Sequence, residues 1–93
     1  MFDFIKKLFG GSTVNYSELI ENGAVIVDVR TPQEYRSGNI RGSLNIPLDQ
    51  LKGNLKKIKK DKPVIVCCAS GMRSGAAKGV LQSNGFTQVY NAG

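Results

Sequence analysis

The sequence predicts an α/β fold, a three-layer α/β/α sandwich around a mostly parallel, five-stranded sheet. Two short runs, AVIVDV (residues 24–29) and VIVC (residues 64–67), are continuously apolar and rich in β-branched residues, as expected of strands that are buried on both faces. Segments with helical start and stop signals alternate with the strand segments. Such alternation builds a parallel sheet that helices cover on each side.

The chain before the first of these strands is expected to form a short strand and a helix. TVNY (residues 13–16) is the expected strand, and YSELIENG (residues 16–23) is the expected helix. Ser17 can act as the N-cap of this helix, and Gly23 can end it.

A second short helix is expected directly after residues 24–29. Thr31 suits the N-cap, Pro32 suits the first helical position, and Gly38 ends the helix. SLNIP (residues 43–47) then predicts another short strand.

The segment LKGNLKKIKKDK (residues 51–62) is expected to be an amphipathic helix that Asp49 caps. Leu51, Leu55 and Ile58 recur at helical spacing and would face the core. The lysines of the segment would then line a solvated face. They are Lys52, Lys56, Lys57, Lys59, Lys60 and Lys62.

The last third of the chain predicts a strand, a turn, a helix and a final strand. The strand at residues 64–67 leads through ASGM into a helix over about residues 73–84. Gly85 ends this helix, and TQVYN (residues 87–91) is the expected last strand.

The composition limits the available chemistry. A chain of 93 residues has room for one domain with an adequate core. The absence of histidine excludes an imidazole base and a histidine metal ligand. The two cysteines are adjacent, so they cannot join distant segments, and no metal-ligand spacing accompanies them. We therefore expect no disulfide framework, no metal and no cofactor.

The net charge of +6 favours anionic ligands or acidic partners. Nucleic acid is not expected, because the lysine run lacks interleaved aromatic residues and no nucleic-acid motif is present.

The N-terminal segment, residues 1–12, is apolar and basic, and a folded domain is expected over residues 13–93. Phe2, Ile5 and Phe9 would form one apolar stripe of a short helix. The stretch is too short for a secretory signal or a membrane span. We therefore expect a cytoplasmic protein without stable membrane insertion.

Reactive side chains gather where the predicted strands end. Asp28, Arg30 and Cys68 follow two strands whose carboxyl ends meet at one edge of the sheet. After Cys68, residues 69–72 turn into a helix, and this turn aims backbone N–H groups and the positive end of the helix dipole inward. Such donors bind anions and stabilise a cysteine thiolate without a histidine. Arg73 adds a planar guanidinium suited to sulfur or phosphorus oxyanions.

Two longer stretches carry distinctive patterns. CASGMRS (residues 68–74) is similar to C-x-x-G-x-R-S, and DVRTPQEYRSGNIRGSLNIP (residues 28–47) is similar to D-V-R-x-x-x-E-[YF]-x-x-G-H-I-x-G-A-x-N-I-P. These are the active-site pattern and the first signature of the rhodanese-like family of single-domain sulfurtransferases. The resemblance covers roughly residues 13–93 and implies the rhodanese-like form of the α/β/α sandwich.

The resemblance implies an enzyme of the thiosulfate sulfurtransferase type. Cys68 would take a sulfane sulfur from thiosulfate or a similar anion, become a persulfide, and pass the sulfur to cyanide or a thiol; a sulfur-carrier protein could be a further partner. Arg73 would bind the oxyanion of the donor, and Asp28 and Arg30 would be scaffold or rim residues. The residues implied for binding are Ala69, Ser70, Gly71, Met72, Arg73 and Ser74.

The sequence departs from the family pattern in three places. Asn39 and Ser43 stand where the family usually has His and Ala, within a packing motif. The family commonly continues beyond residues 91–93 with another glycine and a closing helix. We therefore expect one flank of the sheet to be less covered.

The doubled cysteine leaves alternatives open. Counted from Cys67 the loop is C-x5-R, the spacing of cysteine phosphatases and arsenate reductases of the same fold, and counted from Cys68 it is C-x4-R. Adjacent strand residues face opposite sides, so only one sulfur can point into the loop. Cys68 is expected to be the better exposed, and Cys67 a buried thiol with a raised pKa. A phosphatase using Cys67 and a non-catalytic binding module of the rhodanese fold remain alternatives.

Overall fold

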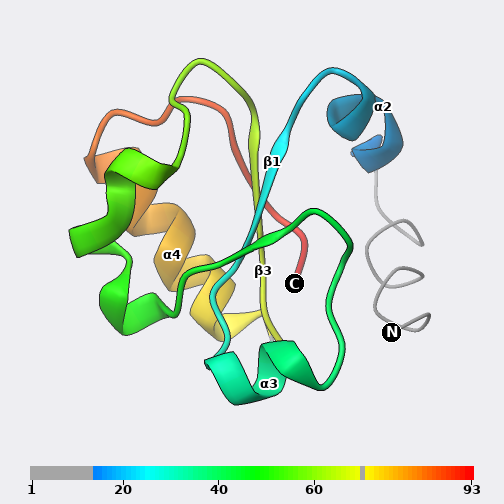
Figure 1. Cartoon of the computed structure of the whole chain (residues 1–93). Coiled ribbons are helices and arrows are strands. Elements are labelled where there is room, and N and C mark those ends of the chain that lie inside the picture. Colours follow the sequence, from blue (N-terminus) through cyan, green and yellow to red (C-terminus); the bar gives the residue numbers. More distant parts are fainter. Residues whose placement is uncertain (1–13, 70) are drawn as a thin grey trace.

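Four parallel strands form the sheet in the computed structural model, which describes residues 14–69 and 71–93 (Figure 1). The strand order is β2-β1-β3-β4, and every neighbouring pair is parallel. The strands are β1 (Val25–Asp28), β2 (Leu44–Asn45), β3 (Val64–Cys67) and β4 (Val89–Asn91). The predicted α/β class is confirmed, with four strands in the described residues rather than five.

The prediction of a strand at TVNY is wrong for its described residues. Residues 14–16 lie in no strand, and helix α2 spans Tyr16–Glu21. The N-cap is Asn15 rather than Ser17, because the Oδ1 atom of Asn15 accepts a hydrogen bond from the Glu18 N–H at 3.1 Å. Asn and Ser are equally good N-caps. Because Asn15 comes two residues before Ser17, the helix begins at Tyr16, inside the segment expected to be a strand.

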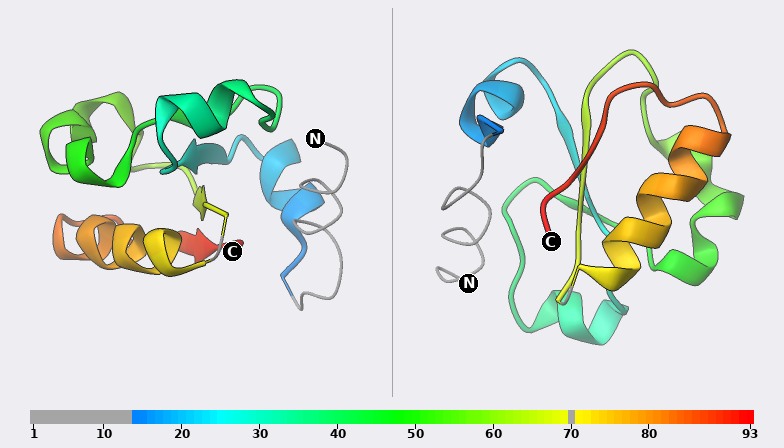
Figure 2. Two further views of the ribbon diagram at one scale, coloured as in Figure 1. Left: turned by 90° about the horizontal axis from the view of Figure 1, so that it is seen from below. Right: turned by 180° about the vertical axis from the view of Figure 1, so that it is seen from behind.

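Helices cover both faces of the sheet (Figure 2). One face carries α4 (Met72–Ser83) and two 3-10 helices, η1 (Leu48–Gln50) and η2 (Lys52–Lys57). The other face carries α2, while α3 (Pro32–Arg36) lies beyond the carboxyl ends of β1 and β3 (Figure 1). The predicted three layers are therefore present.

Two apolar clusters fill the spaces between these layers. Val27 and Val66 belong to the cluster under α4, η1 and η2, whereas Ile26 and Ile65 belong to the cluster under α2. All four side chains are buried. Full burial of one such side chain stabilises the folded state by about 1.5–3 kcal/mol. Because β1 and β3 face an apolar cluster on both sides, apolar residues are favoured at every position, which explains their continuously apolar sequences.

The lysine-rich segment does not form the expected α-helix. Asn54 interrupts η2 with φ −127° and ψ 18°, and its side-chain amide donates to the Gln50 carbonyl oxygen at 2.8 Å. Such side-chain bonds to the backbone compete with regular helix. Asp49 lies inside η1 and makes no capping hydrogen bond. The residues of the segment that pack into the core, as predicted, are Leu51, Leu55 and Ile58.

Helix α3 begins as predicted. Thr31 is its N-cap and Pro32 opens it. The Thr31 hydroxyl accepts from the Glu34 N–H at 3.2 Å, and the Glu34 carboxylate accepts from the Thr31 N–H at 3.1 Å. This complete capping box fixes Glu34 in the first turn of α3, at the sheet edge where β1 and β3 end.

The N-terminal stripe of Phe2, Ile5 and Phe9 lies outside the described residues. Within the described residues, no helix has the length and apolar character needed to cross a membrane.

Candidate active site

Cys68 lies directly after β3, and two backbone N–H groups point at its sulfur. The Gly71 N–H donates to Cys68 Sγ at 2.9 Å, and the Ser74 N–H donates to it at 3.3 Å. Gly71 is the N-cap of α4 and has φ +87°, a left-handed conformation that glycine adopts without steric cost. The loop after β3 therefore directs N–H donors at Cys68, as the sequence predicts.

A side-chain network connects this loop to the last strand. Ser74 is fully buried, and its Oγ atom accepts from the Cys68 thiol at 3.4 Å. The Ser74 hydroxyl has two acceptors, Asn91 Oδ1 at 2.6 Å and the Gly71 carbonyl oxygen at 3.1 Å, and Asn91 Oδ1 is the nearer. Asn91 Oδ1 also accepts from the Gly93 N–H at 2.9 Å. Asn91 therefore orients the hydroxyl group that contacts the Cys68 sulfur.

Asn91 is not among the residues that the sequence predicts for the site. It ends β4, where it pairs in register with Val66 of β3. The hydroxyl of Tyr16 donates to its backbone carbonyl at 3.3 Å, which further fixes the end of β4. Functional side chains gather at the carboxyl ends of parallel strands, the rule that selects Asp28 and Cys68. Asn91 is a polar residue at the carboxyl end of the last strand, so the same rule could have identified it.

Arg73 forms an ion pair with α3. Its Nη1 and Nη2 atoms donate to Glu34 Oε1 and Oε2 at 2.7 and 2.9 Å, a bidentate arrangement. The two side chains are 33% and 37% exposed, so solvent screens the attraction. The pair connects the first turn of α4 to the first turn of α3 and thereby positions the loop between Cys68 and Arg73.

The contribution of this ion pair to the stability of the fold is expected to depend on pH. The side-chain hydrogen bond from Arg73, followed by the Thr31 N–H, lowers the pKa of Glu34 from its ordinary 4.5 to about 2. A carboxyl group with a lowered pKa in the folded state stabilises that state above its ordinary pKa and loses the effect as the pH falls through the folded value. We expect Glu34→Gln to lower the melting temperature at neutral pH, and the two proteins to converge as the pH falls toward about 2.

The melting temperature, followed by circular dichroism across the acid range, measures this effect. Glu21→Gln changes an exposed glutamate of α2 and is expected to show no such convergence. A difference between Glu34→Gln and the parent chain that stays constant down to acid pH would contradict the assignment.

Cys67 lies on the opposite face of the sheet from the loop. It packs in the cluster of Ile26 and Ile65, and its Sγ atom donates to the Val27 carbonyl oxygen at 3.8 Å. Burial, followed by the charge of Asp28, raises the pKa of Cys67 to about 12. Such a thiol is protonated and unreactive at neutral pH. The C-x5-R spacing therefore begins at a sulfur that faces away from the loop, whereas the loop N–H groups contact Cys68.

The expected difference in exposure between the cysteines is wrong. Cys68 is 0% exposed and Cys67 is 1% exposed. Ser74 of α4 packs against the Cys68 sulfur, and the Cys68 N–H donates to the Gly93 carbonyl oxygen at 3.4 Å, so the chain covers both sides of the residue. What distinguishes the two sulfurs is that Cys68 accepts backbone N–H bonds while Cys67 faces a carbonyl oxygen.

Asp28 and Arg30 form a buried ion pair at the end of β1. Asp28 is 0% exposed and Arg30 is 8% exposed. Arg30 Nη2 donates to Asp28 Oδ2 at 2.7 Å, and Arg30 Nε lies 2.9 and 3.0 Å from the two carboxylate oxygens. Arg30 Nη2 also donates to the Gly38 carbonyl oxygen at 2.6 Å. The pair therefore connects β1 to the segment that follows α3.

The other predicted binding residues belong to the segment after Cys68. Ala69 and Met72 are exposed, and Ser70 lies outside the described residues. No three His, Cys, Asp or Glu side chains of the described residues gather as metal ligands. A cavity of about 340 Å³ reaches Arg73; its other lining residues are Val29, Thr31, Pro47, Leu48 and Asp49.

The chain is similar to known proteins over most of its length. A family model described as "Rhodanese-like domain" matches residues 12–92. The uncharacterized protein YqhL of Bacillus subtilis (strain 168) is 47% identical over 73% of this chain, and the thiosulfate sulfurtransferase PspE of Escherichia coli (strain K12) is 41% identical over 72%. The matches span 54% of YqhL and 66% of PspE. A solved structure described as "rhodanese with anions from E. coli" has a TM-score of 0.72 and 37% identity, covering 76% of this chain and 86% of that chain.

Proposed function

This chain belongs to the rhodanese-like domain family, and we propose that it is a sulfurtransferase of the thiosulfate sulfurtransferase type in which Cys68 carries the transferred sulfur. The observation that carries this proposal is the pair of backbone N–H donors, from Gly71 and Ser74, at 2.9 and 3.3 Å from Cys68 Sγ. The activity named for PspE, a relative with the same domain, supports the choice of sulfur chemistry.

The geometry suits a thiolate nucleophile. N–H groups that already point at the sulfur stabilise negative charge on it without reorganisation. The Cys68 thiolate attacks the outer sulfur of thiosulfate, a bond between the two sulfurs of thiosulfate breaks, and sulfite leaves with the electron pair. A thiolate acceptor or cyanide then attacks the terminal sulfur of the persulfide, and the electron pair of the broken S–S bond returns to Cys68.

Donor binding would use the positive charge beside the loop. Two N–H groups of Arg73 face Glu34, and the others are the groups that would contact the oxyanion of the donor. Cys68 is 0% exposed, so neighbouring groups must move before the donor can reach the sulfur.

Parallel assays with thiosulfate plus cyanide and with an aryl phosphate test the proposal. We expect formation of thiocyanate and no release of phosphate. Phosphate release without sulfur transfer would favour the cysteine phosphatase alternative. Inactivity toward both substrates, with no sulfur bound to the protein after treatment with thiosulfate, would favour the binding module.

Asn91→Ala is expected to slow sulfur transfer by about ten- to a hundredfold, because small displacements of positioned groups have effects of this size. The variant removes the nearer of the two acceptors of the Ser74 hydroxyl, whose oxygen lies 3.4 Å from the Cys68 sulfur. The measurement is the steady-state rate together with the pH dependence of Cys68 alkylation by iodoacetamide. Asn22→Ala, at an exposed asparagine after α2, is the control and should change neither. An unchanged alkylation profile in Asn91→Ala would contradict the positioning role of Asn91.

A further inference from the structure

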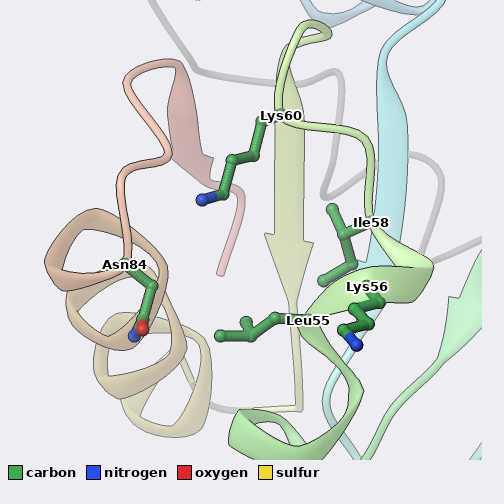
Figure 3. Close-up of a pocket in the computed structure, with 5 residues that line it drawn as sticks. All are labelled: Leu55, Lys56, Ile58, Lys60 and Asn84. Carbon is green, nitrogen blue, oxygen red and sulfur yellow. The ribbon is translucent and has the colours of Figure 1, made fainter.

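A second cavity lies between η2 and the C-terminal end of α4 (Figure 3). Its volume is about 340 Å³, and its lining residues are Leu55, Lys56, Ile58, Lys60 and Asn84. Helix α4 has 12 residues, so its two ends lie roughly 18 Å apart. The loop after Cys68 is at one end and this cavity is at the other, so the cavity is distinct from the candidate active site.

The cavity combines an apolar floor with a cationic rim. Ile58 is buried and Leu55 is half-buried, and both provide aliphatic surface. Lys56 and Lys60 are exposed and provide the ammonium groups. Figure 3 shows the side chains of Leu55 and Lys60 extending into the space between η2 and α4, toward Asn84.

The Lys60 ammonium group lies beside the residues that follow α4. Lys60 Nζ lies 5.5 Å from the centroid of the Phe86 ring, within the range of a cation–π interaction. It also lies close to Gly85, two residues after the last residue of α4, and the carbonyl groups at a helix C-terminus attract cations. A charge that is already positioned loses less entropy when a ligand binds.

No carboxylate of the described residues neutralises this rim. Lys56 and Lys60 form no ion pair within residues 14–69 and 71–93. The segment 51–62 contains six lysines and one acidic residue, Asp61, and residues 62–93 contain no Asp or Glu. Uncompensated positive charge around an apolar floor favours a ligand that joins an apolar group to negative charge.

We propose that this lysine-rimmed pocket docks an acidic segment of a partner protein. One aliphatic side chain of the segment enters the cavity over Leu55 and Ile58, and the flanking carboxylates contact Lys56 and Lys60. The cavity is at the small end of the range for ligand sites, about 300–1,000 Å³, which suits one large side chain. The segment that provides this rim also carries further exposed lysines outside the cavity, and their field attracts a chain with several carboxylates more strongly than a small anion. These lysines are Lys52, Lys57 and Lys59.

Fluorescence anisotropy with a labelled peptide, Glu-Glu-Leu-Glu-Glu, tests the proposal on the full chain. Lys56→Glu with Lys60→Glu is expected to raise the Kd at least about tenfold. The matched control, Lys57→Glu with Lys59→Glu, makes the same charge change outside the cavity and should raise it by less than about threefold. A peptide with Ser in place of Leu should bind about fivefold more weakly or worse, because it buries no aliphatic side chain.

Backbone amide NMR of the complex locates the peptide, and thiosulfate turnover of the charge variants checks that they fold. Shifts confined to the residues around Leu55 and Asn84 support the pocket. Equal weakening by both double variants, equal binding of the Ser peptide, shifts centred on Gly71 and Ser74, or no binding at low ionic strength would each overturn the proposal.

Discussion

Cys68→Ser is expected to lose more than about 99% of thiosulfate-dependent sulfur transfer, whereas Cys67→Ser keeps most of it. A serine oxygen cannot accept the sulfane sulfur to form a persulfide. Cys68 receives the N–H groups of Gly71 and Ser74, while Cys67 lies on the other face of the sheet with a pKa raised to about 12 by burial. The steady-state rate of thiocyanate formation measures the difference between the two variants.

Both substitutions place a hydroxyl group in a buried position, so each rate is normalised to the folded fraction measured by circular dichroism. The opposite pattern, with Cys67→Ser inactive and Cys68→Ser active, would assign the loop to Cys67. The C-x5-R spacing and the phosphatase alternative would then apply.

Asp28→Ala is expected to lower the free energy of unfolding by about 3–5 kcal/mol, a large part of the 5–15 kcal/mol typical of a domain. The variant leaves the Arg30 guanidinium buried, at 8% exposure, without the carboxylate that accepts from its Nε and Nη2 atoms. Removing one partner of a buried ion pair destabilises a fold by far more than the net value of the pair. Urea unfolding followed by circular dichroism measures the loss.

Two further variants separate this effect from a general loss of packing. Asp28→Leu with Arg30→Met replaces both charges with apolar side chains and should recover a large part of the stability. Asp61→Ala removes an exposed carboxylate and should change the free energy of unfolding by less than about 0.5 kcal/mol. A loss below about 1 kcal/mol for Asp28→Ala would show that the charge of Arg30 is solvated without its partner.

The features that the sequence predicts correctly are those that local chemistry determines. The apolar runs at residues 24–29 and 64–67 become β1 and β3 because each strand faces an apolar cluster on both sides. Thr31 and Pro32 start α3 with a capping box, and the turn after β3 leads into helix α4. These signals need no knowledge of the distant chain.

The features that the sequence does not predict depend on competition between neighbours or on tertiary contacts. Asn15 and Ser17 are both good caps, and only the packed helix selects Asn15. The pairing of Arg73 with Glu34 joins residues that are 39 positions apart. The burial of Cys68 depends on what packs around it, namely Ser74 of α4 and Gly93, two residues after β4. A strand-end cysteine signals the chemistry of the site but not its accessibility.

The most direct test of the central claim is the mass of the intact chain after treatment with thiosulfate in the absence of an acceptor, followed by peptide mapping. We expect one added sulfur atom on Cys68, which disappears when cyanide is added. An added sulfur on Cys67, or no added sulfur at all, would contradict the assignment of Cys68 as the residue that carries the transferred sulfur.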